Sequence, residues 1–249
     1  MATFGQDDVW PPLEYEERPW HNAQNVYGSR TQKRRTAGPY MAAVPPFISR
    51  RAIPLDGELH ALTGETTSEL ARFDAEVGQV AVTFASILLR TEGASSTEIE
   101  NLTSGARQIA LAELGEHCSR NAQLIVGNVS AMQAALHLSE FIDGHAILEM
   151  HRALIEQSNP DIVGHWRDQQ VWICGGSLGP HAAQFVPPHH ERVTALMDDL
   201  VVFANRVDLP VLARTAIAPA QFETIHPFSD GNGRFGRAPS SLLVQGYST

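Results

Sequence analysis

Residues 226–237 read HPFSDGNGRFGR, and this stretch decides how the rest of the chain is interpreted. It combines a histidine, a carboxylate, an amide between two glycines and two arginines. Glycines let backbone N–H groups approach an anion closely, and a helix beginning near Gly233 adds the positive end of its dipole. On that helix Arg234 and Arg237 share a face, so both guanidinium groups can reach phosphate oxygens. A polar turn before a helix is the simpler interpretation, and the unusual order of these residue types disfavours it.

The stretch resembles the Fic motif, HPFx(D/E)GNGRxxR, and agrees with it at every specified position. The same residues also satisfy the dinucleotide-binding pattern GxGxxG, from Gly231 to Gly236. That pattern belongs in a βαβ unit, after a strand, with an acidic ribose ligand about 20 residues further on. No β-rich run precedes it, and the sequence ends before that distance is reached. The Fic interpretation is therefore favoured.

The composition is that of a globular protein, with 43% hydrophobic and 18% charged residues among 249. A net charge of −10 disfavours broad nucleic-acid binding, which needs a basic face, so we expect no nucleic-acid partner. Cys118 and Cys174 have no CxxC spacing, which predicts neither a disulfide framework nor a zinc site and fits a reducing cytoplasm. The first residues lack the apolar segment of a signal peptide, and no run of 18 apolar residues occurs. We therefore expect a cytoplasmic protein without a membrane segment.

The sequence divides into three parts. Residues 1–55 are rich in proline and aromatic residues without sustained periodicity, and predict an extended arm whose aromatic side chains pack onto the next domain. Residues 56–124 show helical periodicity, because apolar residues recur at three- and four-residue steps. Residues 125–249 form the predicted Fic core.

Helices are expected in the second and third parts. A long helix from about residue 65 should break at residues 93–96, before a short helix over 97–102. Further helices are expected over 109–116, 130–155, 193–201 and 212–223. The helix over 130–155 should end before Asn159-Pro160, because the residue before a proline disfavours the α region.

Residues 170–174 and 183–186 are short β-prone runs joined by a glycine-rich segment, which predicts a hairpin. Fic proteins are α-helical with a β-hairpin flap over the active site. The resemblance therefore implies an all-α, Fic-type helical bundle in which this hairpin is the flap. Val171, Trp172 and Ile173 would then position a protein target. A solvent-exposed hairpin of another kind would show the same pattern.

The resemblance implies a protein adenylyltransferase, which transfers AMP from ATP to a Ser, Thr or Tyr hydroxyl of a protein, itself included. His226 would be the base, a role that accelerates reactions about 100- to 10,000-fold. Asp230 corresponds to the ligand of Mg²⁺, which prefers oxygen, although a turn or helix-capping role fits an aspartate equally well. The implied nucleotide-binding residues are Phe228, Gly231, Asn232, Gly233, Arg234 and Arg237.

Residues 96–101 read STEIEN and match the inhibitory pattern of the family, (S/T)xxxE(G/N), from Ser96 to Asn101. In Fic proteins the glutamate of this pattern pairs with the second arginine of the motif. Here Glu100 would occupy Arg237, so that the γ-phosphate of ATP cannot bind productively. The same residues also fit an ordinary capping box. The complete Fic motif in the same chain favours the inhibitory interpretation.

Pro239 departs from the family, because it falls inside the helix expected after the loop, where proline costs about 3 kcal/mol. Only twelve residues follow Arg237, so we expect either a reduced C-terminal half of the core or a truncation. Two other functions stay open. One is removal of AMP from a modified protein, with Glu100 orienting the water. The other is a silenced Fic domain that binds a partner by β-augmentation.

Overall fold

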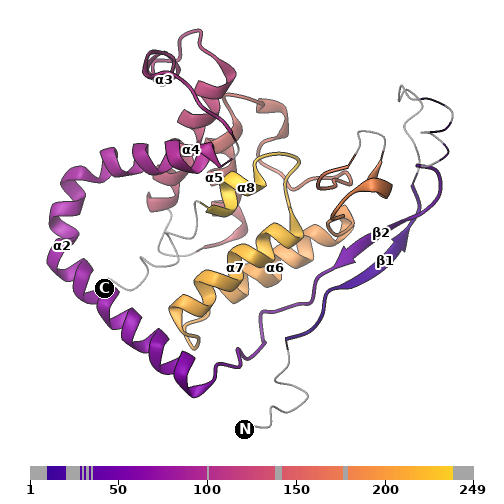
Figure 1. The fold of residues 1–249 in the computed structure, drawn as a ribbon, viewed down its shortest axis with the longest axis horizontal. Helices are drawn as coiled ribbons and strands as arrows, with labels where there is room; N and C mark the ends of the chain where they lie inside the picture. Colours follow the sequence, from indigo (N-terminus) through magenta and orange to yellow (C-terminus); the bar gives the residue numbers. More distant parts are fainter. Residues whose placement is uncertain are drawn as a thin grey trace.

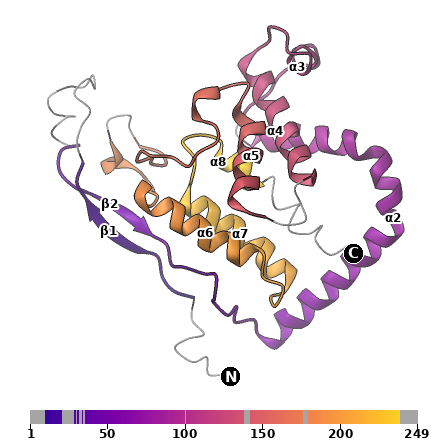
Figure 2. The same ribbon diagram turned by 180° about the vertical axis from the view of Figure 1, so that it is seen from behind.

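The structure is a computed structural model that describes residues 10–20, 29, 31, 34, 36–99, 101–137, 142–175 and 179–237. The described chain is mostly helical with one small two-stranded sheet, which confirms the expected class. Figure 1 shows α6 and α7 in the middle, the sheet on one side of them and the long helix α2 on the other. The view from behind in Figure 2 shows the same order. Among the described residues, no helix combines the length and apolar character needed to cross a membrane.

The N-terminal arm forms the sheet, which the sequence did not predict. Strand β1 (Glu14–Arg18) pairs antiparallel with β2 (Tyr40–Val44). The expected aromatic packing is present, because the Trp20 ring lies edge-on to Tyr40 and to Trp172, with ring centroids 5.8 and 5.5 Å away. The arm is thus fastened to the region predicted as the flap.

Helix α2 (Gly57–Glu98) begins where the Asp56 carboxylate accepts a hydrogen bond from Leu59 N–H at 2.8 Å. It continues through residues 93–96, so the predicted break and the separate helix over 97–102 are wrong. Glycine inside a helix costs only about 1 kcal/mol, which a long helix tolerates. Helix α3 (Ala106–Glu113) follows.

Two helices replace the single one predicted over 130–155. Helix α4 (Arg120–His137) and helix α5 (Gly144–Ile155) are separate, because the Asp143 side chain caps α5 by accepting from Ala146 N–H at 2.7 Å. The two helices pack closely at Gly127, where a Cβ would lie 2.2 Å from the Leu154 carbonyl oxygen. A short 3₁₀ turn, η2 (Pro160–Ile162), follows α5.

In the described residues 170–175 and 179–186, the predicted hairpin is reduced to one antiparallel bridge between Ile173 and Phe185. Ile173 N–H donates to the Phe185 carbonyl at 2.9 Å, but Cys174 and Gly175 then take positive φ values of 59° and 88° and turn the backbone away. The second run lies beside the sheet, because Ala43 N–H donates to the Val186 carbonyl at 2.9 Å. The 3₁₀ turn η3 (Pro180–Ala182) separates the runs.

Helices α6 (Val193–Ala204) and α7 (Val211–Ile225) confirm the predictions over 193–201 and 212–223. The 3₁₀ turn η4 (His190–Arg192) precedes α6, and the short α8 (Asn232–Arg237) follows the motif loop. The main core lies among α5, α6, α7 and α8, and its largest buried side chains include Phe203, Phe228, Phe235, Leu154 and Met197. Pro239 lies outside the described residues.

Candidate active site

His226 ends helix α7 in a left-handed backbone conformation, with φ 52° and ψ 61°. Its N–H donates to the Phe222 carbonyl at 2.8 Å and closes the last turn of the helix. Glycine is the usual residue in such a cap, because a side chain there costs roughly 1–2 kcal/mol. The chain accepts this strain and thereby turns directly from α7 into the loop. The imidazole remains partly accessible, with 21% of its side-chain surface exposed.

Glu223 lies one turn before His226, and its Oε2 is 3.6 Å from His226 Nδ1. The distance is longer than a hydrogen bond, but a carboxylate at this place favours the tautomer protonated on Nδ1. That tautomer leaves Nε2 as the proton acceptor. Gly236 makes room for the carboxylate, since a Cβ there would lie 2.6 Å from Glu223 Oε1. The sequence analysis missed Glu223, although its spacing of three residues on one helix face was a usable signal.

Asn232 closes the motif loop. Phe228 N–H donates to Asn232 Oδ1 at 2.9 Å, and Asn232 Nδ2 donates to the Phe228 carbonyl at 2.8 Å. The side chain is buried, with 2% of the residue exposed. Its oxygen is therefore used to hold the loop, whereas the sequence analysis assigned Asn232 to the phosphates.

The Phe228 ring, placed among the nucleotide-binding residues by the sequence analysis, is buried in the core beneath the loop. It stacks on His151 of α5, with ring centroids 3.6 Å apart and planes 8° from parallel. His151 Nε2 lies 3.1 Å from the Asp230 carbonyl oxygen. Burial lowers the pKa of His151 to about 4, so at neutral pH the ring is uncharged and donates to that carbonyl through Nε2–H. Sequence reasoning missed His151, because only the fold brings α5 under the loop.

Asp230 and Arg234 come together at the far end of the loop. Asp230 Oδ1 accepts from Gly231 N–H at 2.6 Å and lies 3.6 Å from Arg234 Nη2. The Asp230 side chain is 48% exposed, whereas that of Arg234 is 3% exposed. Gly231 has φ 84°, and a Cβ there would lie 2.9 Å from Ile155 Cδ1, so only glycine fits this turn. Gly233 is half-buried in the first turn of α8.

The Asp230 carboxylate has the chemistry of a magnesium ligand. Asp230 offers a half-exposed carboxylate, and the described residues contain no cluster of three metal-binding side chains. Mg²⁺ keeps several waters and usually takes one or two carboxylates together with substrate phosphates. The accessible carboxylate of Asp230 meets the protein's part of that requirement.

The other predicted site residues are only partly described. Val171, Trp172 and Ile173 are half-buried, and Trp172 packs against the cluster that contains Tyr40 and Ala42 of the sheet. Ser96 lies in the last turns of α2, and Asn101 follows in a turn with φ 57°. Glu100 and the side chains of Ser96 and Arg237 lie outside the described residues, so the predicted ion pair is not tested. Helix α2 does contact α8, which ends at Arg237.

Residues 141–243 match the family model of the Fic/DOC family. Over 101 residues, 39% of the chain, the sequence is 32% identical to "Protein adenylyltransferase fic-1" of Caenorhabditis elegans, of which the match covers 18%. The match thus spans less than a fifth of that curated relative.

Among solved structures, a Fic family protein from Desulfovibrio desulfuricans G20 is similar with a TM-score of 0.59 and 25% identity. The similarity covers 75% of this chain and 57% of that one. A Fic domain containing signaling protein from Bacteroides thetaiotaomicron has a TM-score of 0.55 at 18% identity, over 73% of this chain and 71% of that one, and supports the fold alone. The bundle therefore has the Fic fold.

Proposed function

Because residues 141–243 match the model of the Fic/DOC family, we propose that this protein transfers AMP from Mg·ATP to a Ser, Thr or Tyr hydroxyl of a protein, itself included. The position of His226 is the main support. Its ring is partly exposed at the start of a loop that Asn232 closes, with the Glu223 carboxylate on the Nδ1 side. Such a ring offers Nε2 to an incoming hydroxyl.

In the proposed reaction the target hydroxyl oxygen attacks the α-phosphorus of ATP while its proton passes to His226 Nε2. The new O–P bond forms as the bond between the α-phosphorus and the bridging oxygen breaks, and pyrophosphate leaves. Proton acceptance by a positioned side chain of this kind contributes about 100- to 10,000-fold.

The phosphates are assigned to the other groups of the loop. Backbone N–H groups around Gly231 and Gly233, with the guanidinium groups of Arg234 and Arg237, would bind the negative charge as it moves off the α-phosphorus. Asp230 would hold Mg²⁺, and the ion would neutralise charge on the phosphate oxygens. The packing of α2 against α8 supports the further proposal that Glu100 inhibits the enzyme by pairing with Arg237.

The test is incubation of the protein with labelled ATP and Mg²⁺, with and without Glu100→Gly. Self-labelling that rises at least about tenfold in the variant supports inhibited transfer, and corresponds to about 1.4 kcal/mol of relieved competition. Arg237→Ala should cancel this gain, and a gain that persists without Arg237 contradicts the pairing.

Two other outcomes identify the alternative functions. Release of label from a protein that already carries AMP, lost in Glu100→Gly, would indicate removal of AMP. If neither form transfers or removes label, the proposed activity fails and a binding module remains. His226→Ala in the Glu100→Gly background is the control that assigns any labelling to this site.

A further inference from the structure

Arg167 lies between the flap and the motif loop and is nearly fully buried, at 3% exposure. Its Nε donates to the His226 carbonyl at 2.8 Å, and Nη1 donates to the Gln169 carbonyl at 2.9 Å. Its Nη2 donates to the Pro188 carbonyl at 2.6 Å and to the Ile225 carbonyl at 3.4 Å. All four acceptors are backbone carbonyl oxygens, so the side chain holds the backbone of these segments in place.

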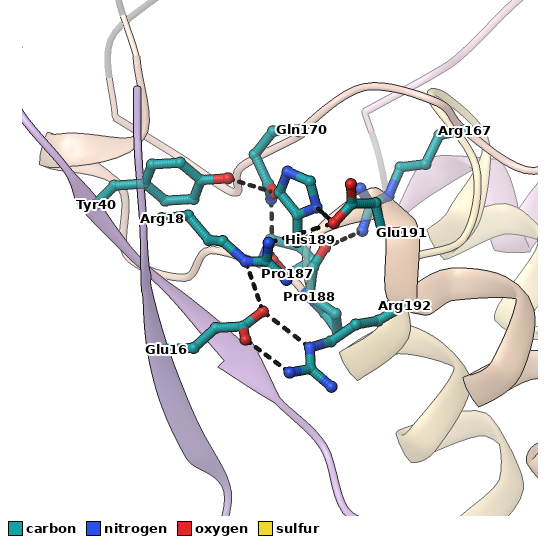
Figure 3. A network of polar contacts seen from close by, with 10 residues as sticks. All are labelled: Glu16, Arg18, Tyr40, Arg167, Gln170, Pro187, Pro188, His189, Glu191 and Arg192. Carbon is teal, nitrogen blue, oxygen red and sulfur yellow. Dashed lines mark hydrogen bonds and ion pairs between the residues drawn. The ribbon is translucent and has the colours of Figure 1, made fainter. Parts of the chain in front are cut away.

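These acceptors belong to three segments that are far apart in sequence. Ile225 and His226 end α7, Gln169 precedes the first run of the flap, and Pro188 follows the second run. The backbone of Arg167 adds a fifth hydrogen bond, since its N–H donates to the Pro227 carbonyl at 2.9 Å. Figure 3 shows the Arg167 side chain reaching Pro188 beside Gln170, whose amide donates to the Pro187 carbonyl at 2.9 Å.

Arg167 also fixes the unusual backbone of His226. The His226 N–H is bound by Phe222, and its carbonyl is bound by Arg167, so both peptide groups of the left-handed residue are held. Burial lowers the pKa of Arg167 to about 10, and the guanidinium stays charged at neutral pH. A charged group donates stronger hydrogen bonds than a neutral one, and the planar fork of arginine reaches acceptors in several directions.

We propose that Arg167 is a positioning residue that holds the His226 imidazole and the flap in one fixed relation. A target hydroxyl carried by the flap would then meet Nε2 of His226 at reacting distance. The proposal rests on the proposed function. Lysine has the charge but lacks the fork, so it can replace only part of these contacts.

The experiment compares Arg167→Met and Arg167→Lys with Arg214→Met in the Glu100→Gly background. Arg214 is the matched control, because it is also buried, at 6% exposure, and donates to the Ala204 carbonyl at 2.8 Å at the end of α6. Arg167→Met should lower kcat for AMP transfer about tenfold or more while the Kd of ATP changes less than about twofold. Arg167→Lys should recover part of the rate. Arg214→Met should lower the Tm but leave kcat within about twofold of its parent.

A second measurement needs no activity. Hydrogen exchange at the Phe228 and Ile173 amides should be faster in both Arg167 variants than in Arg214→Met. If the parent protein transfers no AMP, the proposed function fails, while the exchange rates still decide whether Arg167 holds the loop and the flap together. Equal exchange in the Arg167 and Arg214 variants, or equal losses of kcat, would overturn the positioning role.

Discussion

The motif loop and the flap lie next to each other, but they are held very differently. In the loop, three side chains bind the backbone: Arg167 at His226, Asn232 at Phe228, and His151 at Asp230. In the described part of the flap, the two runs share one antiparallel bridge, Ile173–Phe185. The motif loop is thus held by buried side chains, which suits the preorganised site that the proposed transfer needs. In the same proposal, the flap pairs through its backbone with a target segment.

The largest expected effect comes from His226→Ala, which removes the reacting group and leaves the loop intact. Transfer should fall about 100- to 10,000-fold, because the lost step is proton acceptance. ATP binding should stay nearly unchanged, since the imidazole acts on the attacking hydroxyl. Calorimetric titration with ATP and a transfer assay check both parts. Retention of more than about a tenth of the transfer would contradict the base role.

Asn232→Ala tests the stiffness of the loop directly. It leaves the buried N–H and carbonyl of Phe228 without their partner, and should lower the free energy of unfolding by about 1–3 kcal/mol. Urea unfolding measures this loss. Ser229→Ala is the control, because Ser229 lies exposed in the same loop. A loss as small as in that control would mean that the loop is held by other contacts.

Ile173→Pro tests the flap at its bridge. Proline cannot donate from its nitrogen, so it deletes the Ile173 hydrogen bond to Phe185 and disfavours pairing with a target. Target modification should fall several-fold, which corresponds to the free energy of about one or two hydrogen bonds, and the Kd of ATP should stay unchanged. Equal losses of ATP binding and target modification would mean that the hairpin only supports the fold.

The smallest expected effect concerns the polar network that fastens the arm beside the flap, drawn in Figure 3. Hydrogen bonds from Arg192 lower the pKa of Glu16 to about 2. The pKa is lower in the folded than in the unfolded state, so the pair stabilises the fold above about pH 4.5 and loses this contribution as the pH falls toward 2. Glu16→Gln should cost about 1 kcal/mol or less at pH 7, and this cost should shrink below pH 4.5. A cost that stays constant from pH 7 to pH 3 in urea unfolding would exclude the ion pair as its source.

The sequence predicted the arrangement of the candidate site best where that arrangement is local. His226, Asp230 and Arg234 lie within one short motif, and their mutual arrangement follows from a turn and the start of a helix. Glu223 was within reach of the same reasoning. Arg167 and His151 were not, because their partners are 59 and 79 residues away and only the packing of the bundle brings them together.

Secondary structure was predicted well where one apolar face meets the core, as in α6 and α7. The predictions failed where a local signal was too weak to decide the structure, or where the deciding contact came from a distant part of the sequence. Residues 93–96 looked like a break, but the cost of Gly93 is small against a helix of 42 residues. The strand β2 was missed because its pairing partner β1 lies more than 20 residues away, across a segment without periodicity.

The close packing at Gly127 has a consequence for which substitutions this chain can tolerate. Its neighbour Leu154 is also the residue whose Cδ2 would meet a Cβ at Gly231, at 3.2 Å. A residue larger than glycine at position 127 of α4 must therefore displace α5 toward the loop. The loop cannot give way at Gly231, because Leu154 and Ile155 of α5 already lie close to it. A mutational scan of the whole chain should accordingly find position 127 among the intolerant sites, although it lies on a helix outside the motif.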